Sequence, residues 1–241
     1  MSPLKGGALA ALFALSPSVP FEWHGAPGKT LTILGVSGEI RVKSASGKEA
    51  TVIGRKTARW CNPESVEIHQ VTSESGVTIC TVEAGLQGCS SRGRQKNVEV
   101  DFEVALPRGV DLVTDSVNGD VVAEGLDSQV SAQTVNGSVR VSTSGSAEAN
   151  TVNGDIHVSL GLLPAGSTSF RTVNGSIDLE LPASAGGTFS ARSTNGDLSS
   201  DFPITTVRGR SHRSIEGTLG PGSAILTLRT VNGQIALHRA H

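Results

Sequence analysis

A short motif, Thr-Val-Asn-Gly followed by one polar and one apolar residue, recurs along the chain and limits the folds that the chain can adopt. Clear copies, some with Ser or Thr substituted, occupy residues 116–121, 134–139, 151–156, 172–177, 193–198 and 230–235. A degraded copy occupies residues 214–219. The motif glycines lie 16 to 21 residues apart. A period of about twenty residues is typical of a repeat architecture, in which each unit packs on its neighbours.

The residues on both sides of the motif alternate between apolar and polar. Before the first copy, Leu112 and Thr114 occupy every second position, and Val121 resumes the pattern after it. Equivalent positions of the other copies are mostly apolar or small. Period two on both sides predicts two short strands per repeat, each with one buried face.

Two geometries satisfy this pattern. Asn-Gly between alternating strands is a strong hairpin signal, which would make the array a chain of hairpins. Alternatively, Asn-Gly forms a corner, and each repeat is one coil of a solenoid whose strands pair in parallel with the coils above and below. We favour the solenoid, because equivalent positions hold like residues and Leu-Pro pairs at 106–107, 163–164 and 181–182 supply a second break in the coil.

Composition agrees with an all-β repeat protein. Only 3% of the residues are aromatic, Tyr is absent, and Gly reaches 29 of 241 residues. Stacked coils bury rows of small and branched side chains, and so need few large rings. The sequence therefore predicts an all-β fold, a parallel β-helix-like solenoid of about seven coils. Its corners are formed by Asn118, Gly119, Asn136, Gly137, Asn153, Gly154, Asn174, Gly175, Asn195, Gly196, Asn232 and Gly233.

The N-terminal half is organised differently. Residues 29–42 already carry the alternation and a Val-Ser-Gly turn, and we interpret them as the first coil. Residues 66–71 and 77–82 alternate on either side of a glycine-containing turn, which predicts an antiparallel hairpin. We therefore expect an N-terminal cap over residues 25–97, made of the first coil and an antiparallel insertion, and solenoid repeats over residues 98–241.

The first residues resemble a short secretory signal. Lys5 precedes an apolar run at 6–15 and a proline-bearing exit at 16–20. We expect residues 1–24 to be a signal peptide or leader, and the protein to be exported to the periplasm or cell surface. No later stretch holds about eighteen consecutive apolar residues, so no transmembrane anchor is expected.

Three cysteines lie in the N-terminal half, and in an exported protein two of them can pair. Cys80 and Cys89 are nearest in sequence, but the pairs that include Cys61 remain open. A zinc site is disfavoured, because the spacings of 19 and 9 residues do not fit the usual ligand patterns and no His lies near Cys80 or Cys89. We expect no metal and no cofactor.

Three sequence features together indicate a resemblance to a known protein family. The Thr-Val-Asn-Gly copies, Val-Thr-Ile-Cys at 77–80 and Ser-Thr-Ser-Gly-Ser-Ala at 142–147 resemble a bacterial adhesin-like family of unknown function with β-strand repeats. The resemblance runs from about Gly28 to the C-terminus. It implies an exported, all-β, solenoid-like protein, and it brings no catalytic residues with it.

The motif asparagines form the first polar row of interest. Asn tolerates left-handed backbone at a corner, and stacked amides can bond along a ladder. We interpret the row as structural rather than as a ligand site. Glu216, at the asparagine position of the degraded copy, is expected to interrupt the ladder.

Arginines form a second row, two residues before the motif Val position. Neighbouring parallel strands lie about 4.8 Å apart, so coils that follow one another would present a column of guanidinium groups. Such cations repel each other by about 1 kcal/mol per pair in water-like dielectric, so counter-charge is expected. Asp155, Asp178, Glu180, Asp197 and Asp201 are the candidates for a mixed-charge face. Without them, the row would be a basic ribbon for an anionic envelope polysaccharide, formed by Arg171, Arg192, Arg213 and Arg229.

Signals for catalysis are weak. The acidic residues are scattered about one per coil, and Ser and His lack nucleophile-elbow spacing. A formal net charge of -2 gives no indication of nucleic-acid binding. We therefore predict a non-catalytic exported or surface module that binds an envelope polysaccharide or a surface protein. The alternatives are a carbohydrate-active β-helix enzyme, a lyase or hydrolase, and an envelope accessory that binds a protein partner.

Overall fold

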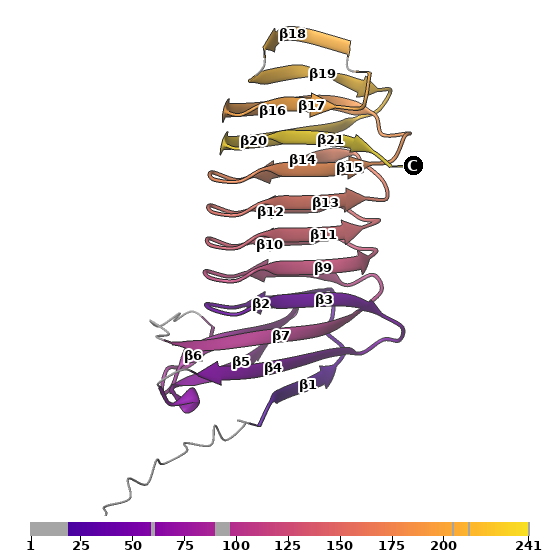
Figure 1. The fold of residues 1–241 in the computed structure, drawn as a ribbon. Coiled ribbons are helices and arrows are strands. Elements are labelled where there is room, and N and C mark those ends of the chain that lie inside the picture. Colours follow the sequence, from indigo (N-terminus) through magenta and orange to yellow (C-terminus); the bar gives the residue numbers. More distant parts are fainter. Residues whose placement is uncertain (1–18, 59–60, 90–96, 204, 212, 241) are drawn as a thin grey trace, which may run out of the picture.

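The protein is a tall stack of β-coils with a set of antiparallel strands at each end (Figure 1). The computed structural model describes residues 19–58, 61–89, 97–203, 205–211 and 213–240, with only the backbone for 205–211. Most of the expected leader, residues 1–18, lies outside the described residues. Residues 21–24, which we also assigned to the leader, belong to the first strand of a sheet.

Two sheets run the length of the stack. Sheet A has 10 strands in the order β1 (Phe21–Gly25), β4 (Ala50–Ala58), β7 (Val98–Pro107), β3 (Ile40–Ala45), β9 (Val121–Leu126), β11 (Val139–Thr143), β13 (Ile156–Leu160), β15 (Ile177–Leu181), β21 (Ile235–Arg239) and β17 (Leu198–Ser200). Sheet B has 11 strands in the order β18 (Thr205–Ser211), β19 (Ser214–Gly220), β16 (Gly187–Asn195), β20 (Ala224–Asn232), β14 (Gly166–Arg171), β12 (Ala147–Asn150), β10 (Val130–Gln133), β8 (Asp111–Asp115), β2 (Thr30–Leu34), β6 (Gly76–Glu83) and β5 (Val66–Thr72).

Each coil takes one strand from each sheet. The chain runs along a strand of sheet B, turns at the Asn-Gly corner and returns along a strand of sheet A, as in β10 followed by β11. Strands of successive coils pair in parallel, for example β10 with β8 and with β12. The strands that flank a corner lie in different sheets, so the alternative of a chain of hairpins is wrong. The predicted all-β, parallel solenoid-like fold is confirmed.

The order of the coils departs from the order of the sequence at the C-terminal end. β20 pairs in parallel with β14 on one side and β16 on the other, and β21 likewise lies between β15 and β17. The last coil of the chain is therefore the second-last of the stack (Figure 1). Residues 182–223, which include β16 to β19, connect the coil of β14 and β15 to the last coil, and they form the strands on the far side of that last coil.

The degraded motif copy, residues 214–219, does not form a coil. Residues 214–219 belong to β19, which pairs antiparallel with β16 and with β18. Glu216 has no amide donor with which to join a ladder, and it pairs with Ser190 in the middle of β16. The six clear copies form six coils, and β2–β3 forms one more.

Antiparallel strands close the N-terminal end. β7 pairs in parallel with β3 and antiparallel with β4, and β1 pairs with the far side of β4. β5 and β6 form the predicted antiparallel hairpin, and β6 joins sheet B beside β2. A short 3-10 turn at Pro63–Ser65, capped by the side chain of Asn62, leads into β5.

The core lies between the two sheets and is built from their alternate residues. Strand β7 shows the pattern, since Val98, Val100, Phe102 and Val104 are buried while the residues between them are exposed. Most buried side chains are Val, Ile, Leu or Ala, and Phe102, Phe170 and Phe189 are among the largest of them. These rows of small and branched side chains are what the composition predicted.

A disulfide joins Cys80 on β6 to Cys89, with Cα atoms 5.6 Å apart. Cys61 keeps a free thiol, which donates a hydrogen bond to the carbonyl oxygen of Asn97 over 3.1 Å. Of the three pairings that the sequence left open, the structure contains the one between the nearest cysteines.

Candidate functional site

The corner motif fixes the geometry of both outer faces, and each of its positions has a separate role. The first residue is buried, and in five of the six clear copies its hydroxyl donates to the carbonyl of the motif glycine in the coil below it in the stack, as Thr151 does to Gly137 over 2.9 Å. The hydroxyl of Ser116, in the first copy, has no such partner among the described residues. The glycine is required by close approach, because a Cβ on Gly154 would lie 2.0 Å from the carbonyl oxygen of Gly137. The coils are therefore locked together at every corner.

The motif asparagines form one continuous amide ladder. Each side-chain nitrogen donates to the side-chain oxygen of the asparagine below, over 2.7 to 2.8 Å. The ladder runs through Asn118, Asn136, Asn153, Asn174, Asn232 and Asn195. It is not interrupted by Glu216, because the degraded copy lies in β19 and outside the row of corners. These amides bond to one another, which supports our structural interpretation of the row.

The arginine row lies on the outer face of sheet B. Arg171 pairs in register with Arg229, and Arg229 pairs in register with Arg192. The spatial order is therefore 171, 229 and 192, which differs from the sequence order because β20 lies between β14 and β16. Arg213 is not part of this row, since it lies in the turn between β18 and β19, where its carbonyl accepts a bond from the backbone NH of Ser193. We call Arg171, Arg229 and Arg192 the arginine column.

The five acids that were expected to supply the counter-charge do not lie on this face. The candidate acids follow the corner and so belong to sheet A or to the corner itself, on the other side of the molecule. Asp155 accepts a hydrogen bond from the backbone NH of Ser176, and Asp178 lies beside His157. The three guanidinium groups of the arginine column are exposed and form no ion pair or hydrogen bond with any described residue. The mixed-charge face that we considered is therefore not formed by these acids.

The arginine column continues into uncharged residues. Beyond Arg171 the same outward position holds Asn150 on β12, then Gln133 on β10, then Asp115 on β8. Glu148 is the nearest outward acid on β12, and it accepts a 3.4 Å hydrogen bond from Asn150. One straight line across the sheet thus passes from three cations to two amides and then to a carboxylate.

A row of exposed valines runs beside the arginine column. Each is the second residue of a motif, and Val135, Val152, Val173 and Val231 are each 39% exposed. The terminal coil has Thr194 at this place. We call these four valines the valine ridge. An arginine and a valine are therefore neighbours on two coils, as Arg171 with Val173 and Arg229 with Val231. Val135 and Val152 lie beside the uncharged Gln133 and Asn150.

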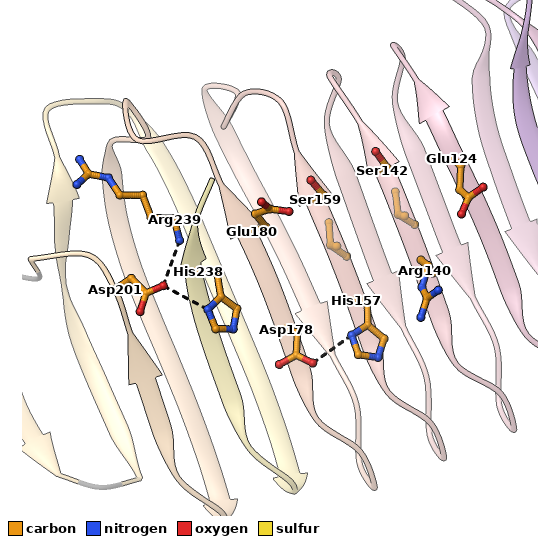
Figure 2. A pocket seen from close by; sticks show the side chains of 12 residues that line it. Glu124, Arg140, Ser142, His157, Ser159, Asp178, Glu180, Asp201, His238 and Arg239 are labelled. Atoms are coloured by element: carbon orange, nitrogen blue, oxygen red, sulfur yellow. Dashed lines mark hydrogen bonds and ion pairs between the residues drawn. The ribbon is translucent and has the colours of Figure 1, made fainter. Parts of the chain in front are cut away.

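The outer face of sheet A carries a different feature, which the sequence did not indicate. A shallow groove of about 520 Å³ crosses β9, β11, β13, β15 and β21, with Ser142 and Ser159 on its floor (Figure 2). His157 lies 3.1 Å from Asp178, and His238 lies 3.3 Å from Asp201. Glu124, Arg140 and Glu180 also line it. These residues occupy the outward positions of sheet A, so strand parity was the signal that placed them on one face.

The groove has limited chemistry. Asp178 and Asp201 each face a histidine, and the backbone NH of Arg239 also donates to Asp201 over 3.4 Å. In the described part of the chain, no three His, Cys, Asp or Glu side chains lie close enough together to hold a metal ion. The groove offers hydrogen bonds and charges of both signs, and no arrangement of nucleophile and base is evident in it.

Perturbed pKa values occur elsewhere, near the N-terminal end of sheet A. The hydrogen bond from Arg55 to Glu103 lowers the pKa of that carboxyl and raises the pKa of the guanidinium. In the same way, the bond between Arg41 and Glu39 raises the pKa of Arg41. All four side chains are largely exposed. They form surface ion pairs and do not mark a catalytic site.

Comparison with known proteins places the fold. A family model described as Toastrack DUF4097 matches residues 24–238. A candidate cell adhesion protein from Clostridium sporogenes has a similar structure, with a TM-score of 0.52 and 12% identity over 92% of this chain and 100% of that one. A candidate adhesin from Bacteroides fragilis aligns with a TM-score of 0.42 and 10% identity, over 91% of this chain and 97% of that chain. No curated protein matches significantly. Within the residues that the structure describes, no helix has the length and apolar character to cross a bilayer.

Proposed function

The chain belongs to the Toastrack DUF4097 family, and from that premise we propose that it is a non-catalytic, adhesin-like binding module of the cell envelope. Its ligand is an anionic polysaccharide, and its binding surface is the arginine column on sheet B. The observation that carries the proposal is that three exposed arginines stand in register and that their side chains have no ion-pair partner among the described residues.

Electrostatics favours an external anion on this face. Three like charges on adjacent strands repel one another, and an anionic ligand relieves that repulsion. Guanidinium groups bind carboxylates and phosphates through paired hydrogen bonds, which favours acidic ligands over neutral ones. The strands that hold the arginines are fixed by the corner ladder, so little order has to be gained on binding.

Export is supported by two features. A disulfide such as the one between Cys80 and Cys89 is typical of an oxidising compartment, and the first residues resemble a secretory signal. We propose a location in the periplasm or on the cell surface. Cell fractionation with mass determination of the mature protein tests this, and a full-length reduced protein found only in the cytoplasm would contradict it.

Binding is tested with a triple variant, in which Arg171, Arg192 and Arg229 are each replaced by Gln. At low salt, we expect the triple variant to be retained less than the wild-type protein on immobilised polygalacturonate. Moderate salt is expected to lower the retention of the wild-type protein as well, because it screens the arginine charges. Arg140→Gln is the matched control, because Arg140 is an exposed arginine on sheet A that forms no ion pair with a described residue. Unchanged retention of a triple variant with wild-type circular dichroism would refute the proposal.

The non-catalytic part has its own test. The groove on sheet A is where a hydrolase or lyase would act, and its carboxylates Asp178 and Asp201 are already engaged with histidines. We expect no release of reducing sugar or unsaturated product from a panel of acidic and neutral glycans. Turnover that disappears in Glu180→Gln would establish the enzyme in place of the binding module.

A further inference from the structure

We propose that the arginine column binds a linear polyuronate lengthwise along the stack, with one sugar carboxylate on each arginine. This inference rests on the proposed function and adds to it the class of polymer, its direction and the number of acidic units that are bound. It follows from the order and the spacing of the side chains on the outer face of sheet B.

The spacing selects the repeat of the ligand. Arg171, Arg229 and Arg192 are in direct register on adjacent parallel strands, which lie about 4.8 Å apart. That distance is close to the length of one pyranose unit in an extended polysaccharide. A polymer with a carboxylate on every sugar therefore carries its charges at a similar interval along its axis, and the long arginine side chains can reach carboxylates that project at different angles from that axis.

The direction follows from what lies along each strand. On β20 the outward residues besides Arg229 are Ile225, Thr227 and Val231, and none of them is charged. A polysaccharide that lies parallel to one strand would contact one arginine, whereas a polysaccharide that lies across the strands contacts three. The valine ridge runs in the same direction, and its methyl groups can pack on the C–H faces of the sugar rings.

The number of acidic units follows from the ends of the arginine column. Beyond Arg192, register pairing continues to Ser214 of β19, so no fourth arginine stands at that end. Beyond Arg171, Asn150 and Gln133 offer amides that suit sugar hydroxyls, and Asp115 then presents a carboxylate to any further acidic unit. The arginine column thus accommodates three acidic units, followed by neutral ones.

Chain length gives the first test, with oligogalacturonates of increasing length as the probe at low salt. We expect affinity to rise by roughly three- to fivefold with each added unit up to the third, the range of an exposed ion pair, and then to level off. The variant Asn150→Arg adds a fourth cation in register and is expected to move the plateau to the fourth unit. A plateau that stays at the third unit in this variant would overturn the lengthwise arrangement.

The spatial order gives the second test, with the two-unit probe. Arg229→Gln leaves its two neighbours separated by a whole strand, so the two-unit probe can bind only one arginine at a time, and its affinity is expected to fall to about that of a one-unit probe on the wild-type protein. Arg171→Gln and Arg192→Gln each leave one adjacent pair, and binding is expected to fall by no more than about twofold, since one of two positions is lost. Arg140→Gln is expected to change nothing. Equal losses in all three column variants would refute the order.

The outcomes separate this inference from the proposed function. If the wild-type protein retains polygalacturonate through its arginines but shows no dependence on chain length, the binding module stands and the lengthwise inference falls. If the wild-type protein retains no acidic polysaccharide at all, both fall. Tighter binding of a linear polyphosphate with the same number of charges would overturn the assignment of carboxylates.

Discussion

At the scale of single residues, every position of the repeated motif stabilises the stack or shapes its surface. The buried hydroxyl and the asparagine amide each bond to the neighbouring coil, and the glycine lets that coil approach. The valine is the one motif residue whose side chain points outward without a polar partner. Substitutions within one copy are therefore expected to have very different costs.

The amide ladder gives the first prediction. Asn153→Ala removes one hydrogen bond to Asn136 and one from Asn174, and is expected to lower the free energy of unfolding by about 1–2 kcal/mol. Asn195→Ala, at the end of the ladder, removes one bond and is expected to cost about half as much. Urea unfolding measures both. The control is Val152→Thr, which copies Thr194 of the terminal coil and is expected to be close to neutral; equal costs for the two asparagines would contradict a ladder.

The glycine gives the second prediction. A Cβ on Gly137 would lie 2.2 Å from the carbonyl oxygen of Gly119, a contact that the locked corner cannot relieve, so Gly137→Ala is expected to destabilise by about 2–3 kcal/mol. A Cβ on Gly220 meets its nearest neighbour at 3.5 Å, an ordinary contact. Gly220→Ala is therefore the control, and it is expected to stay within about 0.5 kcal/mol of wild type in thermal or urea unfolding. Similar losses for both would show that close approach is not the cause.

The pair of Arg55 and Glu103 gives a prediction on pH. The arginine lowers the pKa of Glu103 in the folded state, so this pair stabilises the fold above the unfolded pKa, and that contribution is lost as pH falls through the folded pKa. Arg55→Gln is expected to return the pKa of Glu103 towards its ordinary value. A carboxyl carbon NMR titration measures it directly. Arg140→Gln should leave that titration unchanged, and an unaltered Glu103 in Arg55→Gln would refute the assigned cause.

At the scale of elements, the coil formed by β20 and β21 is inserted between two others. Its neighbours, β14 and β16, pair with it in the same register, since Phe170 and Ala191 both face Leu228. The two neighbouring strands are thus equivalent in alignment as well as in sequence pattern. Without the inserted coil, their edges would match each other.

A shortened chain tests this equivalence. In a chain that ends at residue 223, we expect β16 to pair directly with β14. Ser169 and Ser190 are then neighbours, whereas in the full chain they flank Thr227 and lie about 10 Å apart, too far for a disulfide. With both replaced by Cys in a Cys61→Ser background, we expect mild oxidation to form the disulfide in the short chain alone. Its formation at equal rate in the full chain would contradict the observed strand order.

At the scale of the whole molecule, the two long faces differ in charge. Sheet B carries the arginine column, and sheet A carries His157, His238 and most of the acids that follow the corners. The coils could be predicted from the sequence because the alternation, as at Leu112, Thr114 and Val121, is a local pattern that can be recognised in each copy separately. It could not predict the order of the coils, because Arg192 and Arg229 sit in copies with the same pattern and either copy fits beside Arg171. The counter-charge was misplaced because Asp155 and Asp178 follow the corner, and so lie on the other sheet.

The inserted coil also affects how the protein is made. Synthesis delivers β14 to β19 before β20 and β21, so the edges that the last coil must join are exposed first, and they match each other. A nascent chain can close this part of the stack early and must reopen it to admit the last coil, which predicts a competition between premature closure and correct insertion. A delay in the pairing of β14 with β16 until β20 and β21 have been synthesised would avoid that competition.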